Sequence, residues 1–179
     1  MRGSVVALAC LSGLALWVGP GVASSSSAPQ CRTTQLSVLR ADADGGLDHA
    51  GLVLRLTNHS VHPCLIGGYV GLLRLDLHRR PVRTVVQRGS GYLFPSAPSH
   101  NIILAPGHSA FAGVEWLNGP VNNEPASCST AGHDLEVTPP NETTHVTIYA
   151  PTSACNSGRL NTTALQVGHI GQEPEHFIR

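Results

Sequence analysis

The chain has 179 residues, and its eleven basic side chains, all arginine, are balanced by eleven acidic ones, so the formal net charge is zero. A chain without a net charge has no overall field that would attract nucleic acid or an anionic lipid surface. The length fits one domain that is large enough to build a two-layer core.

The N-terminal segment has the features of a secretory signal peptide. A short positive start at Met1-Arg2 precedes an apolar run, Val5–Val18, and small residues then lead up to Ser24. The run is shorter than the roughly 18–20 apolar residues that a membrane span needs. We therefore expect a signal peptide over residues 1–23, with retention of this segment as an anchor as the alternative.

After a Ser/Pro linker at residues 24–30, short runs of alternating apolar and polar residues recur between turn signals. We expect about nine strands, near residues 35–40, 52–57, 73–77, 82–88, 102–104, 109–117, 135–137, 146–148 and 160–167. No window of helical length carries an apolar stripe. The sequence predicts an all-β fold, an immunoglobulin-like antiparallel β-sandwich over residues 31–167, followed by a flexible tail at residues 168–179.

Alternation also predicts which side chains face the core. The expected inward rows are Leu36 and Val38; Leu52, Leu54 and Leu56; Leu73, Leu75 and Leu77; Ala110, Ala112, Val114 and Trp116; Leu135 and Val137; and Val146 and Ile148. Arg74, Asp76 and His78 are expected to face outward. Two long loops, Gly89–Asn101 and Asn118–Ala131, separate these strands. We expect Tyr92, Leu93 and Phe94 to fold back over an open edge of the sandwich.

Four cysteines remain after Cys10 is removed with the signal peptide: Cys31, Cys64, Cys128 and Cys155. An even number behind a signal peptide predicts two disulfides formed in an oxidising compartment. A hairpin about the turn cluster Asp42–Gly46 would bring Cys31 near Cys64, and a later one about Asn141 would bring Cys128 near Cys155. We therefore expect the pairs Cys31–Cys64 and Cys128–Cys155.

Four segments occur in the order seen in a known family: Thr57-Asn58, Cys64–Tyr69, Leu104–Gly107 with Ala110 and Trp116, and Leu135–Pro140. Together they resemble the secreted actinobacterial domain-of-unknown-function family numbered four-two-three-two, over about Cys31 to Val167. The chain departs from that pattern at Val70, where the family often has proline. The resemblance implies an exported envelope or extracellular β-sandwich, and it implies no activity.

Two groups of residues suggest chemistry. The pair His59 and His62 lies in a turn before Cys64, and imidazoles of this kind bind copper or zinc. The segment Gly107–Phe111 is similar to a nucleophile elbow, but it lacks the closing glycine and a strand follows it where the elbow needs a helix. Glu115 has no second carboxylate placed to act with it as a glycosidase pair.

The sequence therefore favours an exported, non-catalytic binding or structural module of the cell envelope or extracellular space, with no cofactor. A copper- or zinc-binding protein that uses His59 and His62 is the first alternative, and a small secreted hydrolase is the second. The expected partner is a protein or another envelope component, not nucleic acid. Contact with a membrane is expected only through an uncleaved N-terminal segment. The long loops Gly89–Asn101 and Asn118–Ala131 are the expected partner surface.

Overall fold

The structure, a computed structural model, describes residues 28–121, 123–124, 128, 131–168 and 170. The expected signal peptide and most of the expected linker and tail lie outside the described residues. Within the described chain there are ten strands: β1 (Leu36–Gly46), β2 (His49–Asn58), β3 (Cys64–Ile66), β4 (Gly71–Leu75), β5 (Val85–Arg88), β6 (Ile102–Leu104), β7 (Ser109–Leu117), β8 (Gly132–Thr138), β9 (Val146–Thr152) and β10 (Arg159–Thr162). One turn of 3₁₀ helix, Thr33–Gln35, precedes β1.

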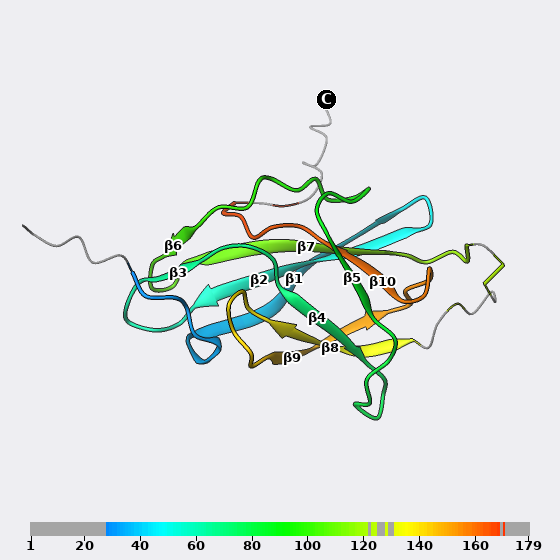
Figure 1. The fold of residues 1–179 in the computed structure, drawn as a ribbon, viewed down its shortest axis with the longest axis horizontal. Helices are drawn as coiled ribbons and strands as arrows, with labels where there is room; N and C mark the ends of the chain where they lie inside the picture. The colour runs from blue at the N-terminus through cyan, green and yellow to red at the C-terminus, as the bar shows by residue number, and fades with distance from the viewer. Residues whose placement is uncertain (1–27, 122, 125–127, 129–130, 169, 171–179) are drawn as a thin grey trace, which may run out of the picture.

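The strands form two facing layers (Figure 1). One layer is a five-stranded sheet in the order β1-β2-β7-β10-β5, and β4, β8 and β9 form a three-stranded sheet across it. A short β3–β6 pair extends the fold at one end. Every strand pair is antiparallel except β10 with β5, which is parallel. The predicted all-β sandwich is confirmed, and β3 is the strand that sequence periodicity missed.

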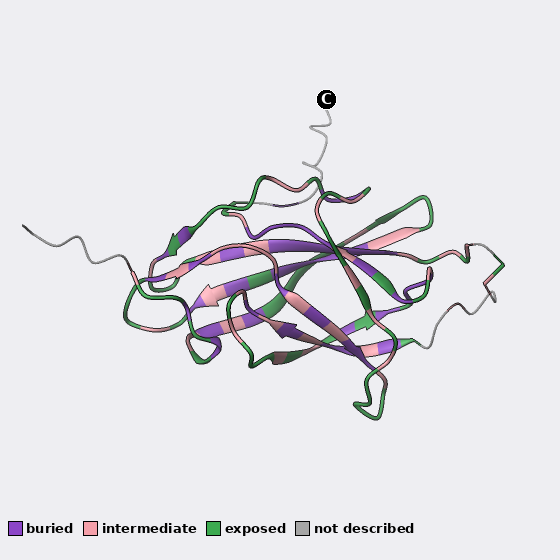
Figure 2. Cartoon of the chain, in the orientation of Figure 1, coloured by how far each residue is buried: buried purple, intermediate pink, exposed green. Residues whose placement is uncertain are grey.

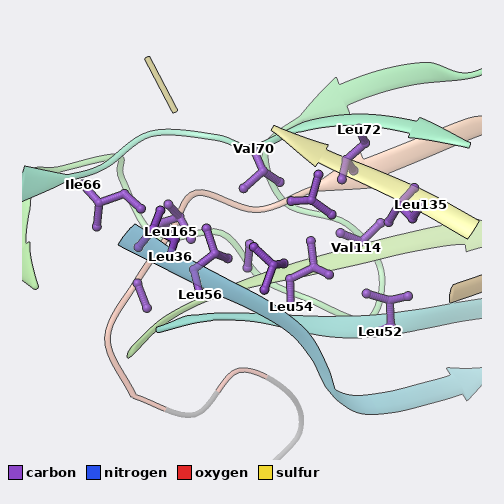
Figure 3. Close-up of a cluster of buried hydrophobic side chains, with 14 of the residues drawn as sticks. Leu36, Leu52, Leu54, Leu56, Ile66, Val70, Leu72, Val114, Leu135 and Leu165 are labelled. Atoms are coloured by element: carbon purple, nitrogen blue, oxygen red, sulfur yellow. The ribbon is translucent and has the colours of Figure 1, made fainter. Parts of the chain in front are cut away.

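The core lies where the predicted apolar rows of the two layers meet. Leu52, Leu54 and Leu56 of β2 are at most 2 % exposed, and they face Leu135 and Val137 of β8 across the core. Figure 3 shows leucines and valines of both layers pointing toward one another, and Figure 2 shows buried positions running along β7. Each leucine that is fully removed from water contributes about 1.5–3 kcal/mol. Since β7 presents small alanines between these leucines, the opposite layer can approach closely.

Both predicted disulfides are present. Cys31 is bonded to Cys64 across a separation of 33 residues, and Cys128 is bonded to Cys155 across 27 residues. The Cys31 amide also donates to the Leu65 carbonyl at 2.9 Å, so backbone and side chain fix the start of the domain to β3. In the chain-entropy model, loops of this size contribute roughly 3–4 kcal/mol each.

The first hairpin turns later than its composition indicates. The turn residues are Leu47 and Asp48, with φ values of 47° and 63°, whereas the predicted turn cluster Asp42–Gly46 belongs to β1. The register is fixed by the pairing of Leu36 with Asn58, and a bulge between Arg40 and Asp42 absorbs one extra residue. The polar glycine-rich cluster is therefore carried into the exposed end of the strand, because inward leucines, not local turn propensity, set the register.

The predicted inward face of the strand at residues 73–77 is wrong at three positions. Leu73 is only partly buried, Leu77 lies beyond β4 and is 69 % exposed, and Arg74, which was expected to face outward, is fully buried. Arg74 pairs with Leu135 on β8, so both share the inward face. Its guanidinium donates to the Thr152 hydroxyl and carbonyl, both at 2.9 Å, and to the Arg83 carbonyl at 3.2 Å. Desolvation lowers the pKa of Arg74 below its usual value.

The strand predicted at residues 82–88 is shorter and pairs elsewhere. It forms as β5, Val85–Arg88, and pairs in parallel with β10 instead of returning along β4. Two backbone contacts position it: the Val82 amide donates to the Arg74 carbonyl at 3.0 Å, and the Val85 amide donates to the Gly158 carbonyl at 3.1 Å. The chain therefore crosses from one layer to the other between Val82 and Val85.

We predict that Arg74→Leu destabilises the domain by about 2–4 kcal/mol, because leucine cannot donate a hydrogen bond and leaves the buried Thr152 carbonyl and hydroxyl without the guanidinium. Chemical denaturation measures this difference. Arg40→Leu, on the exposed part of β1, is the matched control and should change the stability by about 0.5 kcal/mol or less. Equal effects of the two substitutions would contradict a structural role for Arg74.

A second polar contact joins the segment before β1 to the turn between β8 and β9. The Glu142 carboxylate, in the turn between β8 and β9, accepts from the Thr33 amide at 3.0 Å and the Thr33 hydroxyl at 2.9 Å. These bonds, the backbone one first, lower the pKa of Glu142 below its ordinary value of 4.5. A lowered folded-state pKa stabilises the fold above the ordinary value, and this stabilisation is lost as the pH falls through the folded-state pKa.

We predict that Glu142→Gln is less stable than the unmodified protein near pH 6. The difference in unfolding free energy should shrink as the pH falls below the ordinary glutamate pKa, since the native carboxylate is then being protonated as well. Denaturant titrations at a series of pH values measure it. A difference that stays constant with pH would show that the charge of Glu142 is irrelevant.

Candidate functional site

The outer face of the five-stranded sheet, which points away from the core, carries a row of polar side chains. Glu115 on β7 pairs with Gly51 on β2 and with Asn161 on β10, and Asn161 pairs in turn with Gln87 on β5. Directly paired residues lie on the same face of a sheet. Four neighbouring strands therefore bring these side chains together, although they are far apart in the sequence.

The long loop Gly89–Asn101 covers part of this outer face, not the open edge that the sequence suggested. Leu93 and Phe94 are buried and form a second small apolar cluster with Val53 and Ile170. The Phe94 ring lies directly on two glycines of the sheet: a Cβ on Gly51 or on Gly113 would come within 2.5 Å of the ring. The two glycines are therefore required for the close approach of the loop.

Glu115 fastens the loop. It is only 4 % exposed, and its carboxylate accepts from the amides of Tyr92 at 2.7 Å, Leu93 at 2.7 Å and Phe94 at 3.2 Å. Three successive amides turned toward one carboxylate form an anion nest, and such charge-assisted bonds are stronger than neutral ones. Gly91 lies against the same carboxylate, and a side chain there would clash with it.

His49, the first residue of β2, lies between Glu115 and the loop. Its ring stacks on Tyr92 with centroids 4.6 Å apart and planes inclined by 24°. Its Nδ1 lies 3.8 Å from Glu115 Oε1, which is too long for a hydrogen bond. Among the described residues, this buried nitrogen has no hydrogen-bond partner.

The second long loop reaches the same end of the sheet through Glu124. Its carboxylate accepts from the amides of Asn156 at 2.7 Å and Ser157 at 2.6 Å. These bonds, that of Ser157 first, lower the pKa of Glu124. The turn that follows Cys155 is thereby fixed from the loop between β7 and β8, and the Cys128–Cys155 disulfide joins the same two segments.

A pocket of about 160 Å³ opens on the polar row. Its lining residues come from β2, β5, β7, β10 and the turn before β10. The β1–β2 hairpin and the loop after β7 extend at this end of the sheet (Figure 1). Leu117 is an apolar part of its wall. The polar lining residues are His49, Gln87, Glu115, Asn156, Arg159 and Asn161. We call this space the outer-face pocket.

The histidines suggested by sequence as metal ligands lie elsewhere. His59 and His62 are exposed in the turn after β2, at the opposite end of that strand from His49. The turn is held by Asn58, whose side chain donates to the His62 carbonyl at 2.8 Å, and Cys64 is in a disulfide. In the described part of the chain, no three His, Cys, Asp or Glu side chains are close enough together to hold a metal ion.

The segment similar to a nucleophile elbow, Gly107–Phe111, forms a turn and the start of β7. Gly107 has a φ of 76°, as the predicted Pro-Gly turn requires, and the Ser109 hydroxyl is 2.7 Å from that of Thr57 on the paired strand. Ser109 is therefore a cross-strand hydrogen-bonding residue. Glu115 faces outward as expected, but it is buried under the loop.

Comparison with known proteins gives one match. The family model described as Domain of unknown function (DUF4232) matches residues 31–170. The chain belongs to this family. Neither the curated proteins nor the solved structures contain a significant match to the chain. Thus the DUF4232 match supports the sequence resemblance and leaves the activity to be argued from the residues.

Sequence analysis did not identify His49, Gln87, Asn156, Arg159 or Asn161 as site residues. The signal for Asn161 and Arg159 was present in principle, since polar residues alternate with buried Leu160 and Thr162 along β10. What the sequence did not supply was the pairing of β10 with both β7 and β5. No helix in the described part of the chain has the length and hydropathy to cross a bilayer.

We predict that Gly113→Ala destabilises the DUF4232 domain by about 1–3 kcal/mol, because its methyl group occupies the position of the Phe94 ring. Gly46→Ala is the matched control, since a Cβ there meets nothing within 4 Å. Chemical denaturation measures both effects. The double variant Gly113→Ala/Phe94→Ala should be more stable than the sum of the single effects predicts, and strict additivity would contradict the contact.

Proposed function

We propose that this DUF4232 protein is a non-catalytic binding module that works in the cell envelope or extracellular space, and that it binds a small ligand in the outer-face pocket. The proposal rests on two carboxylates that fix the backbone around the pocket. Glu115 accepts hydrogen bonds from three successive amides of the loop Gly89–Asn101, and Glu124 accepts from two amides of the turn at Asn156. Glu115 and Asn156 themselves line the pocket, so these two lining residues are held in place before a ligand arrives. Preformed sites lose less conformational entropy on binding.

The state of Glu115 favours binding over catalysis. A general acid or base needs a carboxylate oxygen within hydrogen-bond reach of the substrate proton that it transfers. Both oxygens of Glu115 already accept backbone N–H groups, from Tyr92 on one side and Leu93 on the other. The carboxylate therefore holds the loop in place, and its charge strengthens these hydrogen bonds.

The disulfides support a location outside the cytoplasm. Cys31, Cys64 and Cys155 are at most 2 % exposed, and the two bonds fix the start of the domain and the turn beside the pocket. Structural disulfides of this kind form and persist in oxidising compartments. The signal-peptide pattern of residues 1–23 supports the same location.

We predict that the full chain binds small molecules at the outer-face pocket. Two-dimensional NMR spectra would be recorded with single compounds at up to about 10 mM, the range in which weak small-molecule binding is still detected. The probes are neutral monosaccharides, inorganic phosphate, free amino acids, acetate and a purine nucleoside. At least one probe should cause saturable shifts of the amide signals of His49, Leu117 and Asn161.

Two matched substitutions control this experiment. Leu117→Trp places a large ring in the pocket and should abolish the shifts, whereas Val61→Trp, at an 81 % exposed position in the turn after β2, should leave them unchanged. If no probe causes saturable shifts at the pocket, or if both variants bind equally well, the proposed function is wrong.

A further inference from the structure

We infer that the outer-face pocket takes a neutral polyhydroxylated ring, the size of a single sugar unit. This inference rests on the proposed function, because it names the ligand class of the same pocket. Three features of the lining carry it: the balance of its charges, the hydrogen-bonding groups that it presents, and its size together with an apolar wall.

The charges of the lining are balanced. The pocket has one fixed cation, Arg159, and one carboxylate, Glu115, and the cation is partly engaged because it donates to Gln87 Oε1 at 3.1 Å. An anionic ligand would be repelled by Glu115, and a cationic ligand would be repelled by Arg159. A ligand without net charge meets neither repulsion.

The remaining polar groups match hydroxyls. Three carboxamide side chains, those of Gln87, Asn156 and Asn161, line the pocket, and each amide offers a donor and an acceptor. A hydroxyl group donates and accepts at once, so neighbouring hydroxyls on a ring can satisfy such amides in pairs. A carboxylate ligand can only accept, and it would leave the amide oxygens without a donor.

Two buried polar atoms without a hydrogen-bond partner also favour a ligand that carries hydroxyl groups. In the part of the chain that the structure describes, the buried Asn161 Oδ1 and His49 Nδ1 lack hydrogen-bond partners. The amide oxygen needs a donor, and a buried acceptor without one costs free energy. A small turn of the Asn161 side chain would present this oxygen to a ligand hydroxyl. A carboxylate ligand cannot supply the required proton.

The size and the apolar wall fit one compact ring. The volume of about 160 Å³ equals the liquid volume of about five water molecules, below the roughly 300–1,000 Å³ of sites for drug-sized ligands. Leu117 lies opposite His49 across the β2–β7 pair, and the His49 ring is itself backed by Tyr92. A sugar ring has an apolar C–H face that can lie on such a wall while its hydroxyls reach the amides.

The test is an NMR titration of the full chain with glucose, galactose and N-acetylglucosamine, and separately with phosphate and alanine as charged comparators. We expect saturable shifts at His49, Leu117 and Asn161 with at least one sugar, at dissociation constants of about a millimolar or tighter. Asn161→Leu, which keeps a similar volume but removes both the amide donor and the unpartnered Oδ1 acceptor, should weaken sugar binding at least about tenfold. Asn101→Leu, at an exposed residue before β6, is the matched control.

The outcomes separate this inference from the proposed function. If phosphate or alanine saturates the pocket signals and no sugar does, the ligand class is wrong and the binding function stands. If neither sugars nor comparators bind there, and the wider probe panel also fails, both are wrong. Sugar binding that Asn161→Leu leaves unchanged would overturn the hydrogen-bonding basis of the inference.

Discussion

The antiparallel pairing of β2 with β7 holds nine residues of each strand in one register, from His49 opposite Leu117 to Thr57 opposite Ser109. This register decides what lies on each side of the sheet, because a shift by one residue would exchange the two faces. On the inner side it aligns the leucines of β2 with the alanines of β7. On the outer side it aligns Gly51 with Glu115. The core and the pocket are thus two consequences of one pairing.

The outer face is divided by what each position allows to approach. At Gly51 and Gly113 the sheet has no side chains, so Phe94 can lie flat on the backbone and exclude water. Beyond them the positions are polar, and Glu115 uses its charge to turn the loop amides toward the sheet. The loop therefore closes over the glycine part and stops at the polar part. The outer-face pocket begins where the glycine part of the face, which the loop covers, meets the polar part.

Alternation predicted the strands well where one apolar row stands alone, as in β2 and β7, whose inward residues are those expected. It failed in β4, where Leu72 and Leu73 are adjacent and either face could be the buried one. There the pairing with β8 decides, and it turns Arg74 inward because Thr152 can accept its hydrogen bonds. The charge of Arg74 suggested that it faces the solvent. Its hydrogen-bond partner Thr152, 78 residues away in the sequence, allows it to face the core instead.

The pocket was harder to predict than the fold because its residues share no local pattern. The disulfide pairs could be predicted from the number of cysteines and the geometry of the hairpins. Asn161 and Glu115, by contrast, become neighbours only through the order of the strands in the sheet. The parallel β5–β10 pair adds Gln87 to the row, and nothing in the composition of β5 indicates that it leaves its neighbour β4. Yet the loops that the sequence singled out as a partner surface do border this row. Loop length was informative since a long ordered loop needs an anchor, and here the anchors are the carboxylates that also shape the pocket.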